Sequence, residues 1–338
     1  MDKPARHAAN ASIACPICGA ATSLRYGGMY DDRYGYPGLF EIRRCGSCGH
    51  CHTEADFDVA ELARLYTQYY PRAAFQVEQY RVPAESRGIG AWWSGERCAA
   101  FRWIPSGVRV LDIGCGLCET LGYHRSRGCE AYGVEADANV RRIAEHYGFD
   151  VHVGLFDADL YPKDFFDYVT LDQVIEHVTD PLEFIRGVAR VLKPGGFAVL
   201  STPNAVGWGA RAFGRKWINW HVPYHLQHFT RRSMKLLAAS AGLDVTTART
   251  LTHSDWAFFQ LAHLLAVPEV GGRHPFWSGE KWLTPRQDQV FLAIARMRKL
   301  GVFQAGTRLF DALGLGDNLL FFLRKPPAVR LPAGTEAA

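Results

Sequence analysis

The feature that most constrains the fold is a regular alternation of apolar runs and amphipathic segments between residues 108 and 251. Short apolar runs fit buried strands, whereas apolar residues at helical spacing fit helices that cover a sheet. We expect strands at 108–113, 131–135, 150–153, 166–171, 197–201 and 243–251, and helices at 119–127, 138–147, 181–192 and 231–241. This alternation predicts an α/β fold with a parallel sheet and helices on both of its faces.

A glycine loop follows the first expected strand and leads into a helix. It contains Asp112, Gly114, Cys115 and Gly116. The glycines let the backbone pass close to a ligand, and the helix N-terminus supplies free N–H groups. Glu135 lies 21 residues after Gly114 (135 − 114 = 21), at the tip of the second strand, where a carboxylate can bind the two hydroxyls of a ribose. The pattern predicts a site for an adenosine-type ligand; the alternative is a tight structural turn with a solvated acid.

The loop lacks the third glycine of a dinucleotide fingerprint and resembles the first motif of class I S-adenosylmethionine (SAM)-dependent methyltransferases. Cys118 stands where that family often has a third glycine. The stretches Phe166–Pro181 and Leu192–Gly196 are similar to the family's fourth-strand motif and to the segment before its fifth strand. The resemblance covers residues 108–251 and implies a Rossmann-like, seven-stranded sheet whose last strand is Asn318–Lys325. An NAD-dependent oxidoreductase is the competing interpretation at the level of the fold.

The same resemblance implies which residues hold SAM. Asp112 would organise the loop, whose glycines would contact the methionine and ribose, and Glu135 would bind the ribose. Leu155 and Phe156 would lie beside adenine, and Asp172 near the methionine portion or the sulfonium. The implied cofactor-binding residues are Asp112, Gly114, Cys115, Gly116, Glu135, Ala136, Leu155, Phe156, Asp172 and Gln173.

The acceptor side is expected in the segment 203–230, which is rich in Trp, His, Pro and Gly and follows the fifth strand. In an open α/β sheet such a loop overhangs the carboxyl ends of the strands, where ligands bind. Its end resembles the P-x-H-L-x-x-F-T stretch of zinc-ribbon methyltransferases associated with sugar and cell-surface glycan pathways. His225 matches the histidine of that stretch, and we predict it as base or substrate ligand, with His221 and Tyr224 behind it. The alternative is that His225 only ties the loop to the sheet.

Two other pairs of residues have both a functional and a structural interpretation. Glu176 and His177 follow the fourth strand and either belong to the site or cap a helix and fix the strand end. Tyr69 and Tyr70 either close the site from the N-terminal side or pack in the core.

Four cysteines near the N-terminus form two Cys-x-x-Cys pairs, Cys15/Cys18 and Cys45/Cys48. The 26 residues between the pairs (45 − 18 − 1 = 26) are enough for a hairpin that brings the four thiolates together. Such a unit resembles a zinc ribbon with a closed, structural Zn²⁺ site. A redox dithiol and a partial iron–sulfur run that uses Cys51 are the alternatives.

Composition limits the class of partner and the location. The net charge of +4 is too small to indicate a nucleic-acid groove. No apolar run reaches the roughly 18 residues that span a bilayer, and no signal-peptide core is present. We therefore expect a cytoplasmic protein without nucleic-acid partners or a transmembrane segment.

The expected domain organisation follows from these assignments. We expect a flexible tail (1–14), a zinc ribbon (15–55), a helical connector and cap (56–104), a SAM-binding core (105–251), a helical lid insert (252–316), the last strand of the core (317–326) and a second flexible tail (327–338). The insert either covers the acceptor pocket or makes a weak contact with a membrane surface.

The function predicted from the sequence is that of a SAM-dependent methyltransferase (EC 2.1.1.-). Its acceptor would be a hydroxyl or carbon of a sugar or related small molecule, in glycan or secondary-metabolite biosynthesis. The alternatives are a lipid-linked or macromolecular acceptor and a non-enzymatic SAM-binding protein.

Overall fold

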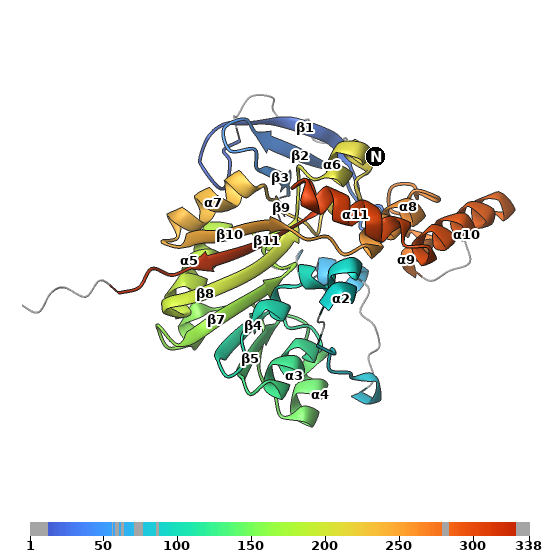
Figure 1. The fold of residues 1–338 in the computed structure, drawn as a ribbon. Helices are drawn as coiled ribbons and strands as arrows, with labels where there is room; N and C mark the ends of the chain where they lie inside the picture. Colours follow the sequence, from blue (N-terminus) through green and yellow to red (C-terminus); the bar gives the residue numbers. More distant parts are fainter. Residues whose placement is uncertain are drawn as a thin grey trace, which may run out of the picture.

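The computed structural model describes residues 13–55, 57, 61, 64–70, 77–85, 88–278 and 284–328. The two predicted tails, 1–14 and 327–338, lie almost entirely outside these residues. Within the described ranges, a seven-stranded sheet forms the body of the molecule, and a smaller four-stranded sheet lies against one of its edges (Figure 1).

The larger sheet has the strand order β10-β11-β8-β7-β4-β5-β6. Its strands are β4 (Arg109–Ile113), β5 (Glu130–Glu135), β6 (Asp150–Val153), β7 (Phe166–Asp172), β8 (Leu192–Pro203), β10 (Asp244–Thr250) and β11 (Asn318–Arg324). Strands β4 to β8 are parallel, and β11 runs antiparallel to both β8 and β10. The predicted Rossmann-like, seven-stranded sheet is confirmed, and the carboxyl ends of β4, β5, β7 and β8 share one edge.

Helices lie on both faces of this sheet, as the sequence predicts. α3 (Glu119–Ser126) and α4 (Val140–Tyr147) belong to one apolar cluster, whereas α5 (Pro181–Val191) and α7 (Arg231–Ser240) belong to another. α5 begins where the carboxylate of Asp180 accepts the N–H groups of Leu182 and Glu183. These caps and the apolar periodicity explain why the helix boundaries agree closely with the prediction.

The cysteine unit folds into the smaller sheet. β1 (Thr22–Met29) and β2 (Phe40–Cys45) form the predicted hairpin, and β3 (Cys51–Glu54) pairs with β2. The fourth strand, β9 (Gln227–His228), comes from the segment after β8 and pairs with β3. The unit is therefore joined to the main domain by backbone hydrogen bonds.

The segments 56–104 and 203–230 differ from the expectation. The first was predicted to be helical throughout. Its described part is helical at Glu61 and Arg64, over the π-helix Leu65–Tyr69 and in α2 (Gly88–Ser94), and otherwise forms short 3₁₀ turns and irregular segments. Pro83, Gly88 and Gly95 interrupt the helical pattern there. The second was predicted to be a loop, yet it contains α6 (Trp208–Phe213), short turns and β9, and its residues 217–230 are all buried.

The predicted helical insert is present between β10 and β11. It contains α8 (Asp255–His263), α9 (Pro275–Ser278), α10 (Pro285–Lys299) and α11 (Val302–Ala312). α8 packs on the segment after β8, since Gln260 accepts the N–H of Ile218 and donates to the carbonyl of Lys216. α10 projects away from the sheet (Figure 1). Among the described helices, none combines the length and apolar character that crossing a membrane requires.

Candidate functional site

The glycine loop after β4 adopts a conformation that favours glycine. Gly114 and Gly116 have φ angles of +77° and +54°, and Cys118 adopts a left-handed conformation with a φ of +64°. A Cβ added at Gly114 would lie 2.6 Å from Cγ2 of Val174, which follows β7. The loop is thus packed closely against the end of a neighbouring strand. It is also tied to β5, because the N–H groups of Gly114 and Cys115 both donate to the carbonyl of Val134.

Asp112 stabilises the glycine loop from the interior side. Its buried carboxylate accepts hydrogen bonds from the hydroxyl of Thr170, at 2.6 Å, and from that of Thr120. Burial raises the pKa of this carboxyl to about 7. Cys115 is buried as well, and a Cβ on Gly133 would meet its sulfur at 2.7 Å. The side chains of Asp112 and Cys115 therefore support the loop from the protein interior.

Glu135 lies at the carboxyl end of β5 and bonds directly to the glycine loop. Its carboxylate accepts the N–H of Gly116 at 2.9 Å and the N–H of Asp137 at 2.8 Å. Burial raises the pKa of this carboxyl above its usual value. The predicted pair of loop and acid is therefore brought together, with Ala136 exposed beside it.

Replacing Glu135 by glutamine is expected to weaken SAM binding by about 10- to 100-fold, since charge-assisted hydrogen bonds contribute roughly 1.5–3 kcal/mol. Isothermal titration calorimetry with SAM measures this directly. Glu130→Gln on the same strand is the matched control, because Glu130 is exposed and pairs with Arg109 outside the loop. Equal SAM affinity in the two variants would mean that Glu135 does not bind the ribose of SAM.

The residues predicted beside adenine lie after β6. Leu155 is 79% exposed, whereas Phe156 packs against Phe184 of α5 with ring centroids 5.4 Å apart. Leu155 is therefore free to cover a ligand, and Phe156 is held partly in the core.

Asp172 and Gln173, predicted near the methionine portion, already have protein partners. The carboxylate of Asp172 accepts the N–H groups of Ala100 and Phe101 and the hydroxyl of Ser201. The Gln173 amide donates to Ser201 and to Asn318, at 3.0 and 2.9 Å. Both side chains thus join β7 to neighbouring segments at the edge where the site lies.

The three predicted acceptor-side residues form one buried cluster. The ring of His221 stacks on Tyr224 at 4.8 Å and meets the ring of His225 at 4.9 Å. Burial holds the pKa of both histidines well below its usual value, so both are neutral near pH 7. His225 Nδ1 lies 2.9 Å from the carbonyl oxygen of Asn219. A carbonyl only accepts, so Nδ1 carries the proton and Nε2 carries the lone pair.

Glu176 and His177 belong to the same cluster. The rings of His177 and His225 are 4.7 Å apart, and ligand atoms of Glu176, His177 and His225 all lie within 4.8 Å of one another. Glu176 is fully buried, and burial raises the pKa of its carboxyl to about 8. Thr202 donates to its Oε2, but among the residues that the structure describes its Oε1 has no hydrogen-bond partner.

Aromatic rings surround this cluster, and three of them come from distant parts of the chain. Tyr34, from the β1–β2 connection, packs edge-on against His221 and Tyr224. The hydroxyl of Tyr66 lies 3.0 Å from His177 Nδ1, and the ring of Tyr70 lies 5.4 Å from that of Tyr224. Through these contacts, the ribbon and the segment before α2 both reach the cluster around His225. Of the tyrosine pair predicted either to close the site or to pack, Tyr70 lies at the cluster.

Tyr69, the other member of that pair, packs against Tyr36 instead, with ring centroids 5.1 Å apart. Glu135 and Glu176 both act electrostatically on Tyr70, and burial is the main reason that its pKa is raised. Ring contacts place Tyr70 against His221 and Tyr224 of the histidine cluster.

The ribbon holds the acceptor-side segment in place. In β3, the N–H of Thr53 donates to the carbonyl of Leu226 and its hydroxyl donates to the carbonyl of His225. The β3–β9 ladder pairs Cys51 with His228 and His52 with Gln227. The ribbon thus fixes the backbone on both sides of His225.

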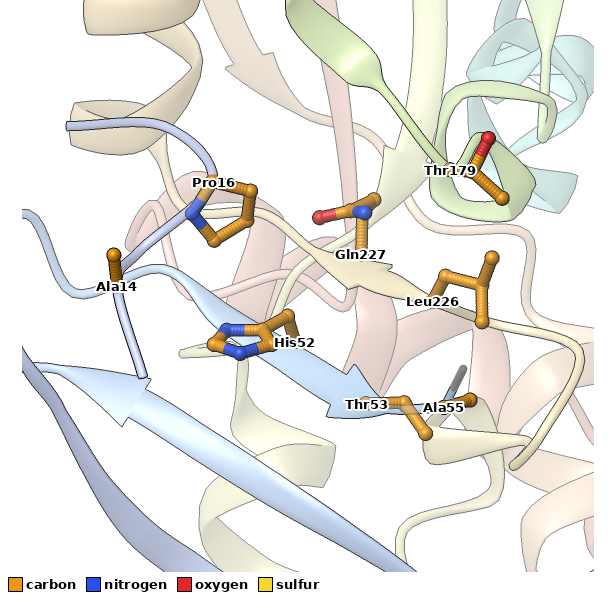
Figure 2. Close-up of a pocket in the computed structure, with 8 residues that line it drawn as sticks. All are labelled: Ala14, Pro16, His52, Thr53, Ala55, Thr179, Leu226 and Gln227. Atoms are coloured by element: carbon orange, nitrogen blue, oxygen red, sulfur yellow. The ribbon is translucent and has the colours of Figure 1, made fainter. Parts of the chain in front are cut away.

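A pocket lies where these two strands meet (Figure 2). It is lined by Ala14, Pro16, His52, Thr53, Ala55, Thr179, Leu226 and Gln227. Its lining includes none of the predicted catalytic residues, although Leu226 directly follows His225.

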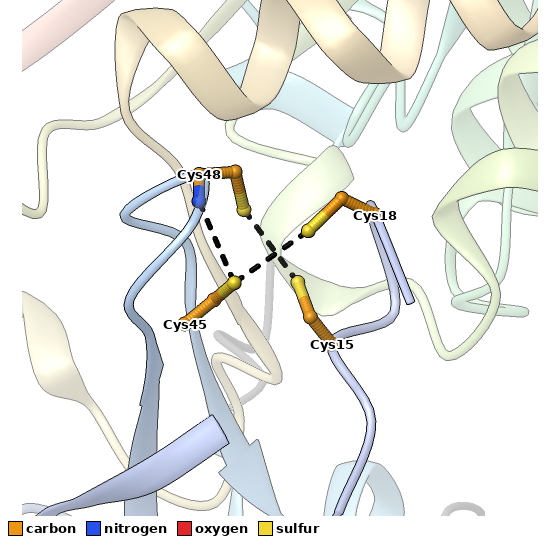
Figure 3. A group of neighbouring side chains, drawn as sticks. All are labelled: Cys15, Cys18, Cys45 and Cys48. Atoms are coloured by element: carbon orange, nitrogen blue, oxygen red, sulfur yellow. Dashed lines mark hydrogen bonds between the residues drawn. The ribbon is translucent and has the colours of Figure 1, made fainter. Parts of the chain in front are cut away.

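The four predicted zinc ligands converge on one point (Figure 3). Cys15 Sγ lies 3.6 Å from Cys48 Sγ, and Cys18 Sγ lies 3.5 Å from Cys45 Sγ. Zn–S bonds of about 2.3 Å place tetrahedral sulfurs roughly 3.8 Å apart, so the geometry fits the ion. Backbone N–H groups of Ile17 and Cys48 point at sulfurs of the set, as expected around thiolates.

Comparison with known proteins identifies the larger unit. The family model described as "Methyltransferase domain" matches residues 93–248. This segment contains the glycine loop, Glu135, the histidine cluster, strands β4 to β9 and most of β10. Residues 93–248 are thus similar to methyltransferase domains.

The relatives of the methyltransferase domain match it over part of their length. A protein named ubiquinone biosynthesis O-methyltransferase from Bradyrhizobium sp. (strain ORS 278) is 38% identical over 108 residues, which cover 29% of this chain and 41% of that protein. A protein of the same name from Xanthomonas axonopodis pv. citri (strain 306) is 27% identical over 171 residues, 46% of this chain and 70% of that protein. The chain spans about two fifths of the length of the first of these relatives.

Among solved structures, Haemonchus contortus phosphoethanolamine N-methyltransferase 2 in complex with SAM matches with a TM-score of 0.46 and 18% identity. The match covers 78% of this chain and 59% of that chain. A likeness of this degree carries no argument about the site.

Sequence reasoning on the methyltransferase domain missed the contributions of Tyr34 and Tyr66 and left Glu176 and His177 undecided. Tyr34 belongs to the ribbon, and the ribbon is joined to this segment by the pairing of β3 with β9, where Thr53 and His228 are 175 residues apart in sequence. A pattern in the local sequence cannot predict a contact between segments so far apart. The Glu-His pair directly after a buried strand was the available signal for the other two.

Proposed function

We propose that this chain is a SAM-dependent methyltransferase that transfers a methyl group to an oxygen of a small, ring-bearing acceptor. The glycine loop and Glu135 would hold SAM, and the cluster around His225 would hold the acceptor. Transfer of the methyl group from SAM to the acceptor is an in-line displacement, in which the protein aligns the two reactants and excludes water. The zinc ribbon would bind one structural Zn²⁺ through Cys15, Cys18, Cys45 and Cys48.

The observation that carries the proposal is the protonation pattern of His225. Its Nδ1–H is tied to the carbonyl of Asn219, which leaves the Nε2 lone pair to accept a proton or bind the acceptor. Burial keeps the ring neutral. A hydroxyl acceptor needs a base near neutral pH, and a neutral, oriented imidazole is suited to that task.

Two further observations support an oxygen on a ring as the acceptor. The relatives are named O-methyltransferases of ubiquinone biosynthesis. The tyrosine rings around His221 and His225 offer flat apolar faces that pack well against a phenol or a sugar. The sugar predicted from the sequence belongs to this class, and so does a phenolic ring.

The test uses SAM labelled in its methyl group with tritium. The purified protein is incubated with a cell extract, and the label is divided into aqueous small-molecule, organic-soluble and macromolecular fractions. We expect label in one of the small-molecule fractions: the aqueous fraction for a sugar and the organic fraction for a lipid-linked phenol. Label in macromolecules would contradict the small acceptor, and no label from a protein that binds SAM would favour a non-enzymatic SAM-binding protein.

A further inference from the structure

We propose that Glu176, His177 and His225 bind a divalent transition-metal ion with coordination positions left open for the acceptor oxygen. The inference rests on the proposed function and deepens it: the Nε2 lone pair of His225 would bind the ion, and the ion, in place of the imidazole, would activate the acceptor hydroxyl at the same site. It concerns a second ion, separate from the zinc of the ribbon.

The first observation is the donor set. One ligand atom from each of the three residues lies within 4.8 Å of the other two. Bonds of about 2.1 Å would bring such atoms roughly 3.4 Å apart, so the side chains need to move inwards by about an ångström. Two imidazoles and one carboxylate form a set that binds Zn²⁺, Fe²⁺ and neighbouring ions.

The second observation is the unsatisfied carboxylate. Glu176 is 0% exposed, and its Oε1 has no hydrogen-bond partner within the described part of the chain. Across the same ranges no Lys or Arg forms an ion pair with it. A buried polar atom without a partner is costly whether the carboxyl is protonated or not, and a bound cation that replaces the proton would satisfy it. Its other oxygen, Oε2, is fixed by the hydroxyl of Thr202 at 3.0 Å.

The third observation is the orientation of the two imidazoles. His177 Nδ1 lies 2.9 Å from the carbonyl oxygen of Tyr224, and His225 Nδ1 lies 2.9 Å from that of Asn219. Both Nδ1 atoms therefore carry protons, and both Nε2 atoms carry lone pairs. Metal-binding histidines usually donate their second N–H to a carbonyl or carboxylate in this way.

Three protein ligands leave at least one position for another oxygen, as in catalytic zinc sites. A hydroxyl bound there loses its proton more easily, as metal-bound water does. In the transfer, the acceptor O–H bond breaks and its proton passes to solvent. The new O–CH₃ bond forms as the S–CH₃ bond of SAM breaks, and the bonding pair stays on sulfur.

The test adds Co²⁺ to protein that already carries one zinc per chain in the ribbon. The visible absorption spectrum of the bound Co²⁺ distinguishes nitrogen and oxygen ligands from thiolate ligands. We expect the spectrum of nitrogen and oxygen ligands. We expect one Co²⁺ per chain, and at least a tenfold weaker affinity in Glu176→Gln. Glu183→Gln is the matched control, because Glu183 is exposed on α5, outside the cluster. SAM binding by each variant checks that it is folded, and His177→Gln replaces Glu176→Gln if the latter does not fold.

Three results of the Co²⁺ experiment would overturn the inference. They are the absence of bound Co²⁺, a spectrum typical of thiolate ligation, and equal Co²⁺ affinity in wild type and Glu176→Gln. Methyl transfer that continues at the same rate after removal of the second ion would also overturn it and leave the proposed function intact. Conversely, a protein that binds Co²⁺ as described but transfers no methyl group would overturn the proposed function and keep the metal site.

Discussion

Replacing Cys45 by serine is expected to abolish zinc binding and unfold the ribbon. Four thiolates converge there, and about 40 residues bury too little apolar surface to fold without a staple. Burial raises the pKa of the Cys15 thiol to about 11, so the metal is needed to hold it as a thiolate. Binding of zinc contributes on the order of 10 kcal/mol to the folding of such units.

The measurement combines metal analysis with hydrogen exchange. We expect the zinc content to fall from one ion per chain to none, and amide protection to disappear in β1, β2, β3 and β9. Cys129→Ser is the matched control, because Cys129 is buried at the start of β5 and far from the cluster in sequence. A Cys45→Ser protein that keeps its zinc, or keeps the protection of β9, would show that the ribbon does not depend on this site.

Replacing His225 by alanine is expected to lower turnover at least 100-fold and leave SAM affinity unchanged within about twofold. A positioned acid–base group contributes roughly 100- to 10,000-fold to a rate. His225 belongs to the cluster that we propose binds the acceptor, whereas the glycine loop and Glu135, which we propose bind SAM, are joined to each other. The measurement is the rate of methyl transfer to the labelled acceptor fraction, together with calorimetry for SAM.

Two controls separate chemistry from structure. His146→Ala removes an exposed histidine of α4 and should change neither quantity. His225→Asn keeps an N–H donor for the carbonyl of Asn219; recovery of turnover in this variant would mean that His225 only ties the loop.

The dependence on pH gives a separate expectation. The pKa of His225 is held low by burial, so its active neutral form persists as the pH falls from 8 to about 6. Turnover limited by this group should therefore stay constant over that range. A decline centred near pH 6.5 would contradict a buried, neutral His225.

The sequence predicted the elements of the core well because local patterns determine them. β6 agrees with its predicted range, and the predicted boundaries of α3, α5 and α7 are within one residue of those observed. The glycine loop and Glu135 were predictable for the same reason, since spacing along two neighbouring strands brings them together. Contacts between distant segments were not. Trp217 and Trp220 read as loop residues, yet both are buried because the ribbon and α8 cover the segment after β8.

In the region before α2, a local pattern indicates the type of element but not the contacts that its side chains make. Regular spacing of Leu65, Tyr66 and Tyr69 indicated a helix, and part of that stretch does coil, as a π-helix over Leu65–Tyr69. Leu62, in the predicted connector (56–104), and Trp282, in the predicted insert (252–316), lie outside the described residues. The tyrosines of this stretch gain their meaning only from the fold, because Tyr66 contacts a histidine 111 residues further along the chain.

Under the proposed function, the pairing of β3 with β9 would give SAM binding and acceptor binding different dependences on zinc. The glycine loop and Glu135 belong to the large sheet, whereas the backbone around His225 is hydrogen-bonded to β3, whose folding we expect to depend on zinc. A cell that is short of zinc would hold a protein that still takes up SAM but cannot present the acceptor to it. Methylation would then require both SAM and zinc to be available.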